Sequence, residues 1–300
     1  MASIKPDLTL IYKKVDHLEI PMDLYLPKNT INAPVLLWFH GGGLLQGCRD
    51  MIAPHMKNAV QTYGFACISA DYRLAPQVEI SEILEDVIDC VIFIRTRLSD
   101  CLGQGVVDAS RLAISGSSAG GYLALLAALV LKSKPQVVAP IYPITDPLGT
   151  FFTKPQPLPV GSDSSEADLD LARLGFFLNP RSTVVANSSE TSPRRHMYAY
   201  MLKTASLARL WGIFPGDEGA VAQWRIPRTI KMGDFPPTYL IHGMDDTAVG
   251  VEQTDEVAGA ILGDRNPVVY ERPNGEDHEF DQRERYENPE LYEFIMRYLN

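Results

Sequence analysis

Apolar positions along the chain form short runs that alternate with helical patterns. Residues 8–15 and 18–26 predict two β-strands joined by a tight turn at Asp16-His17. Residues 35–39 are wholly apolar and end at His40-Gly41-Gly42-Gly43, a pattern typical of a buried parallel strand that stops at a glycine-rich loop. Further short strands are expected at residues 66–70, 112–115, 136–140, 238–241 and 268–271.

Helical patterns fill the gaps between these strands. Residues 51–63 predict a helix with Asp50 as its N-cap, and apolar residues at helical spacing predict another over 80–98. Residues 119–131 are apolar on almost every side, as expected for a helix packed at the middle of a sheet, and residues 289–299 predict a closing helix. The alternation predicts an α/β fold with a mostly parallel sheet covered by helices on both faces.

One long segment, residues 147–235, departs from this alternation. It opens with a proline-rich stretch at 154–159 and continues through helical and irregular patterns that contain many aromatic and methionine residues. A loop of this length without its own structure is uncommon inside a domain, so we interpret the segment as an inserted, mainly helical cap. Residues 1–146 and 236–300 are then expected to form the two parts of one core.

The composition is that of an ordinary globular protein, because 46% of the 300 residues are hydrophobic and 21% are charged. The net charge of −10 argues against a nucleic-acid partner and an anionic membrane surface, since both need clustered Lys and Arg. The adjacent basic pairs Lys13-Lys14 and Arg194-Arg195 are expected at the solvated surface. The composition leaves the oligomeric state open, and a homodimer is compatible with it.

The cysteines and the apolar runs bear on the cellular compartment. Cys48, Cys67, Cys90 and Cys101 lack the spacing of a disulfide framework or a metal site, and Cys67 and Cys90 are expected to be buried free thiols. The first ten residues lack the apolar core of a signal peptide. The longest apolar run, residues 122–131, is shorter than the roughly 20 residues that span a bilayer. We therefore expect a cytoplasmic protein without stable membrane insertion.

The pattern Gly116-Ser117-Ser118-Ala119-Gly120 indicates a nucleophilic serine on a tight strand-to-helix turn. Its glycines are needed because side chains at the flanking positions would clash with neighbouring backbone. The strand expected at 112–115 and the helix expected at 119–131 supply this setting, so Ser118 is the candidate nucleophile. The alternative interpretation is a helix-capping serine in a glycine-rich turn.

The three glycines after His40 indicate an oxyanion hole. Glycine lets the backbone approach a ligand closely and direct two N–H groups at one point. Together with the N–H at the start of the following helix, this pattern predicts that Gly42, Gly43 and Ala119 bind the oxyanion. The alternative is a flexible surface turn, which the apolar pair Leu44-Leu45 directly after it does not favour.

A nucleophilic serine needs a base and an acid that orients the base, in the chain order serine, acid, histidine. The strand at 238–241 ends in a loop that holds Asp245 and Asp246, and Asp246 is favoured because it is the third residue after Gly243. Asp245 stays open as an alternative. The strand at 268–271 is followed by His278, the candidate base, whereas His242 is expected to serve packing or hydrogen bonding.

Five motifs together resemble the hormone-sensitive-lipase-like family of α/β-hydrolases. They are HGGG at 40–43, DYRLAP at 71–76, GSSAGG at 116–121, HGMDD at 242–246 and GEDHEF at 275–280. The resemblance implies an α/β-hydrolase fold, an oxyanion hole in the HGGG loop, and structural rather than catalytic roles for Asp71 and Arg73. The layout is also similar to that of fungal tailoring hydrolases of secondary metabolism.

The chain departs from the family pattern at several positions. Ser117 stands where many members have Asp, and Asp246 is followed by Thr247-Ala248 instead of Pro-Leu. Family members commonly build part of the cap before the first strand, so we expect this cap to come mainly from residues 147–235. This places the substrate-determining region outside the motifs.

These expectations converge on a serine hydrolase of the carboxylesterase type. The triad Ser118, Asp246 and His278 would act by acyl transfer on a small to medium apolar ester, lactone or other acyl compound, without a metal or an organic cofactor. The same triad is compatible with thioester release from a carrier protein, with C–C bond hydrolysis or with cyclisation. A ligand receptor on a hydrolase scaffold is the alternative from a different class.

Overall fold

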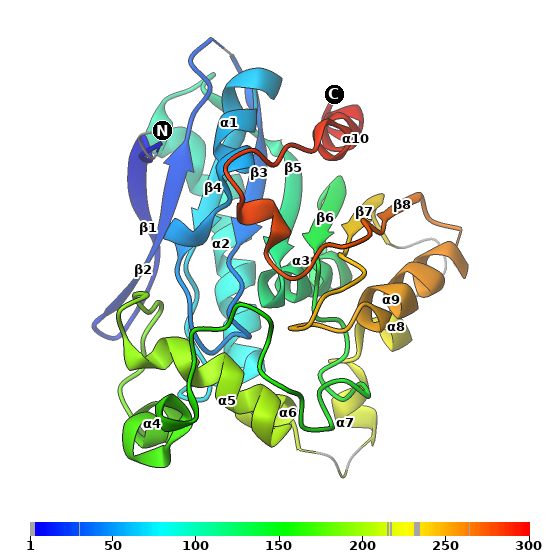
Figure 1. Ribbon diagram of the computed structural model, residues 1–300. Helices are drawn as coiled ribbons and strands as arrows, with labels where there is room; N and C mark the ends of the chain where they lie inside the picture. The colour runs from blue at the N-terminus through cyan, green and yellow to red at the C-terminus, as the bar shows by residue number, and fades with distance from the viewer. Residues whose placement is uncertain (1–3, 30, 215, 217, 231–234, 264) are drawn as a thin grey trace.

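A single mixed sheet organises the computed structural model, which describes residues 4–300 except 30, 215, 217, 231–234 and 264 (Figure 1). In this described part the strand order is β1-β2-β4-β3-β5-β6-β7-β8. From β4 to β8 all neighbouring strands are parallel, whereas β1 and β2 pair antiparallel. The strands are β1 (Leu8–Val15), β2 (Leu18–Tyr25), β3 (Ala33–Phe39), β4 (Ala66–Ala70), β5 (Val107–Ser117), β6 (Val137–Ile141), β7 (Thr238–Ile241) and β8 (Val268–Glu271). The expected mostly parallel sheet is confirmed.

Helices cover the sheet on both faces because successive strand residues point to opposite sides. Along β3, Val35 and Leu37 pack on one face with α2 and α3, while Leu36 and Trp38 pack on the other face with α1 and α10. The covering helices are α1 (Pro54–Tyr63), α2 (Ile80–Leu102), α3 (Ala119–Val130), α9 (Glu252–Gly263) and α10 (Pro289–Leu299). Among the described residues, no helix is both long and apolar enough to cross a membrane.

The expected start and N-cap of the first helix are both wrong. Asp50 does not cap α1, because it lies in a short 3₁₀ turn (η1, Arg49–Met51), and α1 begins only at Pro54. The turn is held in place by Asp71, whose carboxylate accepts the Arg49 backbone N–H at 2.7 Å and the Arg49 guanidinium at 2.7 Å. Proline then starts the helix, as its fixed φ favours at this position.

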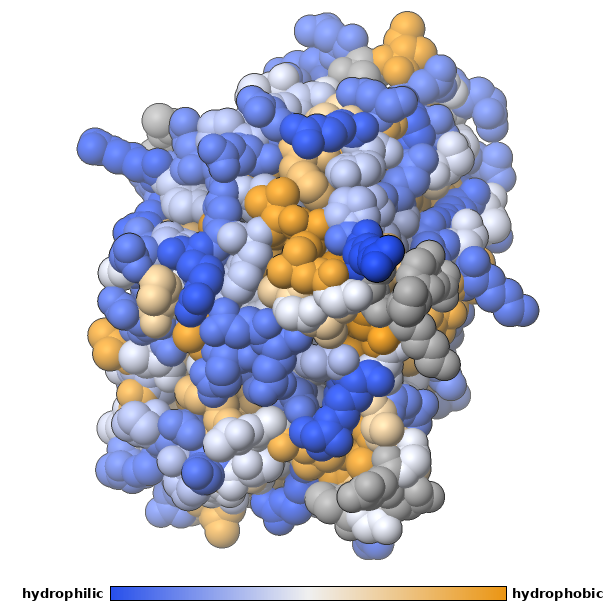
Figure 2. Space-filling view, turned by 90° about the vertical axis from the view of Figure 1, so that its right-hand side faces the viewer, coloured by the Kyte–Doolittle hydropathy of each residue, from blue (hydrophilic) through white to orange (hydrophobic). Residues whose placement is uncertain are grey.

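The edge of the sheet at β8 is solvated. All of its side chains are half-buried, and the face of the molecule over β8 and α9 is mainly hydrophilic with small hydrophobic patches (Figure 2). Helix α9 was not expected from the sequence, because its buried residues include the polar Gln253 and Thr254 beside only three apolar ones, Val257, Ala258 and Ile261. The alternation of strands and helices therefore continues to the end of the chain.

Between β6 and β7 the chain adds short helices, most of which lie beyond one end of the strands, whereas the last of them lies beside α9 (Figure 1). In the described part of this inserted segment (residues 147–235) they are η2 (Glu166–Leu169), α4 (Leu171–Leu178), η3 (Pro193–His196), α5 (Met197–Thr204), α6 (Leu207–Leu210), α7 (Glu218–Ala222) and α8 (Ile226–Thr229). Residues 215, 217 and 231–234 of the expected cap lie outside the described residues. The division of the chain into core and cap stays a prediction.

Arg194 fastens the inserted segment to the loops at the carboxyl ends of the strands. Its guanidinium donates to the carbonyl oxygens of Leu45 at 2.6 Å and Ala75 at 2.7 Å, and to Gln77 Oε1 at 2.8 Å. The expected surface position is wrong for Arg194, which is 3% exposed. It is also wrong for Lys13, whose side chain is 14% exposed and pairs with Asp86 and Asp89, since both basic groups find acceptors in the fold.

Two further expectations from the sequence hold. Cys67 and Cys90 are buried free thiols. Asp71 and Arg73 have structural roles, as expected. Asp71 binds Arg49, and the Arg73 guanidinium binds Asp86 of α2 through its Nε and Nη2 atoms.

Candidate active site

Ser118 lies on the sharp turn between β5 and α3. Its φ of 56° and ψ of −119° are strained for a residue with a side chain. A Cβ at Gly116 would lie 2.2 Å from the Gly120 carbonyl, and a Cβ at Gly120 would lie 2.0 Å from the Phe39 oxygen. Both flanking positions therefore require glycine, as the sequence pattern predicts. Ala119 opens α3, where the first N–H groups have no acceptor within the helix.

The loop after β3 approaches the same turn. Gly42 and Gly43 have φ values of 90° and 66°, which favour glycine. Gly42 lines a cavity together with Ser118. Gly43 and Ala119 are buried and lie outside the cavity lining in the described part of the chain. Of the three expected oxyanion residues, the structure thus brings Gly42 to the cavity, with Ala119 next to Ser118 in the chain.

Asp246 and His278 form a close pair beyond the ends of β7 and β8. His278 Nδ1 lies 2.7 Å from Asp246 Oδ2, and Asp246 Oδ1 accepts the backbone N–H groups of Ala248 at 2.9 Å and Val249 at 2.7 Å. Asp245 is exposed on the same loop. The structure therefore brings Asp246, rather than Asp245, to His278.

Electrostatics favour the charged carboxylate beside this imidazole. Burial would raise the pKa of the Asp246 carboxyl, but the facing histidines, His278 first, hold that pKa well below its ordinary value. Burial would likewise lower the pKa of His278, but the charge and hydrogen bond of Asp246 outweigh burial and raise it. The pair combines a buried anion with an imidazole that binds a proton more tightly than usual.

Ser118 and His278 line the same cavity of about 270 Å³. In the described part of the chain, the hydrogen bonds of His278 run from its Nδ1 to Asp246 and from its backbone N–H to Asp277. Its Nε2 is left for a partner in the cavity, and Ser118 and His278 are not hydrogen-bonded to each other. Contacts of this kind often tighten only when a substrate binds.

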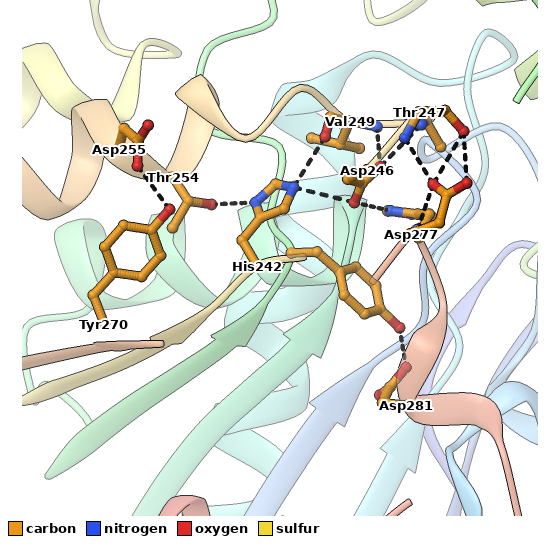
Figure 3. Close-up of polar contacts among 12 residues, drawn as sticks. His242, Asp246, Thr247, Val249, Thr254, Asp255, Tyr270, Asp277 and Asp281 are labelled. Carbon is orange, nitrogen blue, oxygen red and sulfur yellow. Dashed lines mark hydrogen bonds and ion pairs between the residues drawn. The ribbon is translucent and has the colours of Figure 1, made fainter. Parts of the chain in front are cut away.

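Asp277 joins the two loops that carry Asp246 and His278. Its Oδ1 accepts the Thr247 backbone N–H at 2.7 Å and the His278 backbone N–H at 2.7 Å (Figure 3). The Thr247 hydroxyl also accepts the backbone N–H of Val160 at 2.9 Å. The sequence interpretation did not single out Asp277, although its place directly before His278 was the available signal.

His242 contacts the other side of Asp246. Its Nε2 lies 3.1 Å from Asp246 Oδ2 and 2.9 Å from the Val249 carbonyl oxygen, and its Nδ1 lies 2.6 Å from Thr254 Oγ1 (Figure 3). The ring is fully buried. The expected packing and hydrogen-bonding role is confirmed.

Few of the aromatic residues of the inserted segment line the cavity. Among the described residues, Tyr198 is the one aromatic side chain in it, since Phe152, Trp211 and other aromatics pack into the core. The remaining lining residues are Gly42, Gln46, Met51, Ser118, residues 159–164, Arg195, Ala199, Ala248, His278 and Glu279. The lining is therefore mixed, with polar side chains beside the candidate nucleophile.

The sequence of the chain is similar to those of known proteins. A family model described as alpha/beta hydrolase fold matches residues 36–282. The chain is 26% identical over 325 aligned positions to the non-reducing polyketide synthase pkbA of Emericella nidulans, with 91% of this chain and 13% of that protein covered. It is 29% identical over 214 positions to the non-reducing polyketide synthase stbA of Stachybotrys bisbyi, with 70% and 9% covered. The chain thus spans a small part of the length of these curated relatives.

Solved structures share the fold. A protein of unknown function from Staphylococcus aureus subsp. aureus Mu50 superposes with a TM-score of 0.74 at 22% identity, covering 98% of each chain. Butyrate-bound Est2, a thermophilic esterase from Thermogutta terrifontis, superposes with a TM-score of 0.65 at 18% identity, covering 97% of this chain and 92% of the esterase. At these identities the likeness shows the fold.

Proposed function

Because the chain belongs to the alpha/beta-hydrolase family, we propose that it is a serine hydrolase that transfers an acyl group first to Ser118 and then to water. The observation that carries this proposal is the buried Asp246 carboxylate 2.7 Å from His278 Nδ1, with the His278 ring and Ser118 lining one cavity. A base held by an acid next to a strained serine is the arrangement that activates a hydroxyl.

In the proposed reaction His278 takes the proton of the Ser118 hydroxyl while the oxygen attacks the substrate carbonyl. The N–H groups of Gly42, Gly43 and Ala119 stabilise the oxyanion, and each such donor typically contributes about 10²–10³ in turnover. His278 then protonates the leaving group, and the acyl group stays on Ser118. Water, deprotonated by His278, releases the acid and restores the serine.

The size of the cavity supports a small acyl group. Its volume of about 270 Å³ falls below the range of about 300–1,000 Å³ that holds drug-sized ligands. Met51, Tyr198 and Ala248 offer apolar surface to the acyl chain, whereas Asp163 and Arg195 offer polar groups elsewhere in the lining. We therefore propose a small to medium ester or lactone as the substrate, and we expect no nucleic-acid partner.

Release of an acyl thioester is the second candidate, and the curated relatives favour it. They are named as non-reducing polyketide synthases, and this chain matches a small part of their length. The proposed acyl-transfer steps apply equally to a thioester, because the leaving group differs only in its sulfur atom. C–C bond hydrolysis and cyclisation use the same residues.

The purified protein should react with a fluorophosphonate probe and should hydrolyse p-nitrophenyl acetate and butyrate faster than the dodecanoate, because the cavity is small. The same protein is assayed against acyl thioesters of N-acetylcysteamine and against a β-diketone. Turnover of thioesters without turnover of aryl esters would favour the second candidate. Ligand binding without any labelling or turnover would instead indicate a receptor and would contradict the proposal.

Tyr198 is expected to limit the length of the acyl chain. Its ring covers Gly43, where a Cβ would lie 2.5 Å from Tyr198 Cδ2, and its hydroxyl donates to the Ala248 carbonyl at 2.7 Å. Tyr198→Ala should raise kcat/KM for the octanoate relative to the butyrate by about 10-fold, as expected for added hydrophobic space. Tyr198→Phe keeps the ring and should keep the wild-type preference. An unchanged preference in Tyr198→Ala would remove Tyr198 from the acyl pocket.

A further inference from the structure

The Asp246 carboxylate lies between two histidine rings. His278 Nδ1 is 2.7 Å from Asp246 Oδ2, and His242 Nε2 is 3.1 Å from the same oxygen. Figure 3 shows His242 beside Asp246, with Thr254 on the other side of the His242 ring. A single carboxylate oxygen therefore has one imidazole toward the cavity and a second imidazole deep in the fold.

The hydrogen on His242 Nε2 follows from its neighbours. That nitrogen lies 2.9 Å from the Val249 carbonyl oxygen and 3.1 Å from the Asp246 carboxylate oxygen, and both of these oxygens can only accept. Nε2 must therefore carry a proton. Nδ1 faces the Thr254 hydroxyl at 2.6 Å, which can donate or accept. Whatever the charge of the ring, its Nε2 hydrogen is bonded to the Val249 carbonyl oxygen and lies close to the Asp246 carboxylate, which it faces with its positive end.

The surroundings fix this donor in place. The His242 side chain and the Asp246 side chain are both fully buried, and the His242 backbone N–H donates to the Glu271 carbonyl of β8 at 3.1 Å. Thr254 belongs to α9, so the ring bridges the end of β7 and a covering helix. With the Ala248 and Val249 N–H groups on Oδ1, the carboxylate is held from three sides before His278 binds it.

We propose that His242 is a positioning residue that acts through Asp246, an inference that rests on the proposed function. With its Nε2–H group 3.1 Å from Oδ2, it holds the carboxylate toward His278 and offsets part of the negative charge that Asp246 directs at the base. His242 does not touch the substrate cavity, since the described lining includes His278 but not His242. It therefore tunes the base without taking part in proton transfer.

The consequence is a defined shift in pH dependence. The groups that face His278 are Asp246, Tyr142, Glu279 and Asp281, with Asp163 and Arg195 in the lining of the same cavity. Loss of the His242 donor leaves more charge on Asp246, which stabilises the protonated His278 ring and raises its pKa further. Since the base must be neutral to act, the acidic limb of kcat/KM moves to higher pH.

Two substitutions at His242 distinguish the contact of Nε2 with Asp246 from the contact of Nδ1 with Thr254. The amide of His242→Gln reaches the position of Nε2 and can still donate to Asp246, whereas the amide of His242→Asn reaches the position of Nδ1 and keeps only Thr254. We expect His242→Asn to lower kcat/KM by about 10-fold or more, since small misplacements of catalytic groups can cost up to about 10²-fold. The acidic limb of the pH dependence of kcat/KM should also move to higher pH in this variant. His242→Gln should stay close to the wild type in both kcat/KM and its pH dependence.

The readouts distinguish this inference from the proposed function. NMR titration of the His278 imidazole in both variants follows its pKa without requiring a substrate. Equal losses in the two variants with an unmoved His278 titration would mean that His242 only packs, and would overturn the inference. A shift in the titration with no labelling or turnover in the wild type would leave the inference standing and reject the proposed function.

If the His242 variants do not fold, Thr254→Val provides a second test, because it leaves the His242 ring in the core. It removes the hydroxyl at Nδ1, so the ring keeps only its contacts at Nε2. The acidic limb should then move in the same direction as in His242→Asn, by a smaller amount. An unchanged limb and an unchanged His278 titration in a folded Thr254→Val variant would also overturn the inference.

Discussion

Replacing Ser118 by alanine should abolish both ester turnover and fluorophosphonate labelling, with a loss in kcat of about 10⁴- to 10⁶-fold. The reason is that both reactions need the Ser118 oxygen, and the turn presents it in a cavity with His278. The substitution removes one oxygen and keeps the Cβ, so the strained backbone at φ 56° meets no new contact. Labelling followed by intact-protein mass spectrometry measures the result directly.

Ser117→Ala is the matched control for this experiment. Ser117 is the neighbouring serine, and its Oγ accepts the indole N–H of Trp38 at 3.2 Å within the sheet. Its loss leaves a buried donor without a partner, which typically costs about 1–3 kcal/mol in the free energy of unfolding. Labelling should persist in a folded Ser117→Ala variant. Full labelling in Ser118→Ala would contradict the assignment of the nucleophile.

Asp246→Asn should lower kcat by about 10⁴-fold with little change in folding, as expected when the group that orients a catalytic histidine loses its charge. An asparagine can present an N–H to His278 Nδ1, which would put the imidazole in the tautomer whose Nε2 carries the hydrogen. That nitrogen could then no longer take the proton of Ser118. Steady-state kinetics on p-nitrophenyl butyrate, with circular dichroism to check folding, measures this effect.

Asp245→Asn tests the alternative acid on the same loop. Asp245 is exposed, and its backbone N–H donates to the Glu276 carbonyl at 3.1 Å, so only its side chain changes in this variant. We expect activity close to that of the wild type, as for other solvated surface positions. A large loss in Asp245→Asn together with retained activity in Asp246→Asn would reverse the assignment.

Strands buried on both faces could be predicted closely from the sequence. The strands expected at 66–70 and 238–241 match β4 and β7, because short apolar runs between turns leave few alternatives. The half-buried edge strand β8 also matches its expected range, 268–271. β5 begins five residues earlier than its apolar run, at Val107, because Val107 pairs with Ala33 at the start of β3. Pairing between distant strands extends an element beyond what local pattern reveals.

The candidate site could be predicted where its residues follow strand ends, and the cavity lining could not. The loops that carry Ser118, Asp246 and His278 each follow a recognisable strand. By contrast, residues 159–164 reach the cavity through contacts such as Val160 N–H to Thr247 Oγ1 at 2.9 Å, which no periodicity signals. Tyr198 was one of many aromatics in the inserted segment, and only the fold separates it from those in the core.

The buried position of Arg194 has a consequence for how the molecule unfolds. Burial lowers the pKa of its guanidinium to about 10, and within the described residues its hydrogen bonds go to neutral oxygens of the loops around Leu45 and Ala75. Lifting the inserted helices would break these bonds, each worth about 1.5–3 kcal/mol when the donor is charged. We therefore expect these helices to unfold together with the sheet in one cooperative transition.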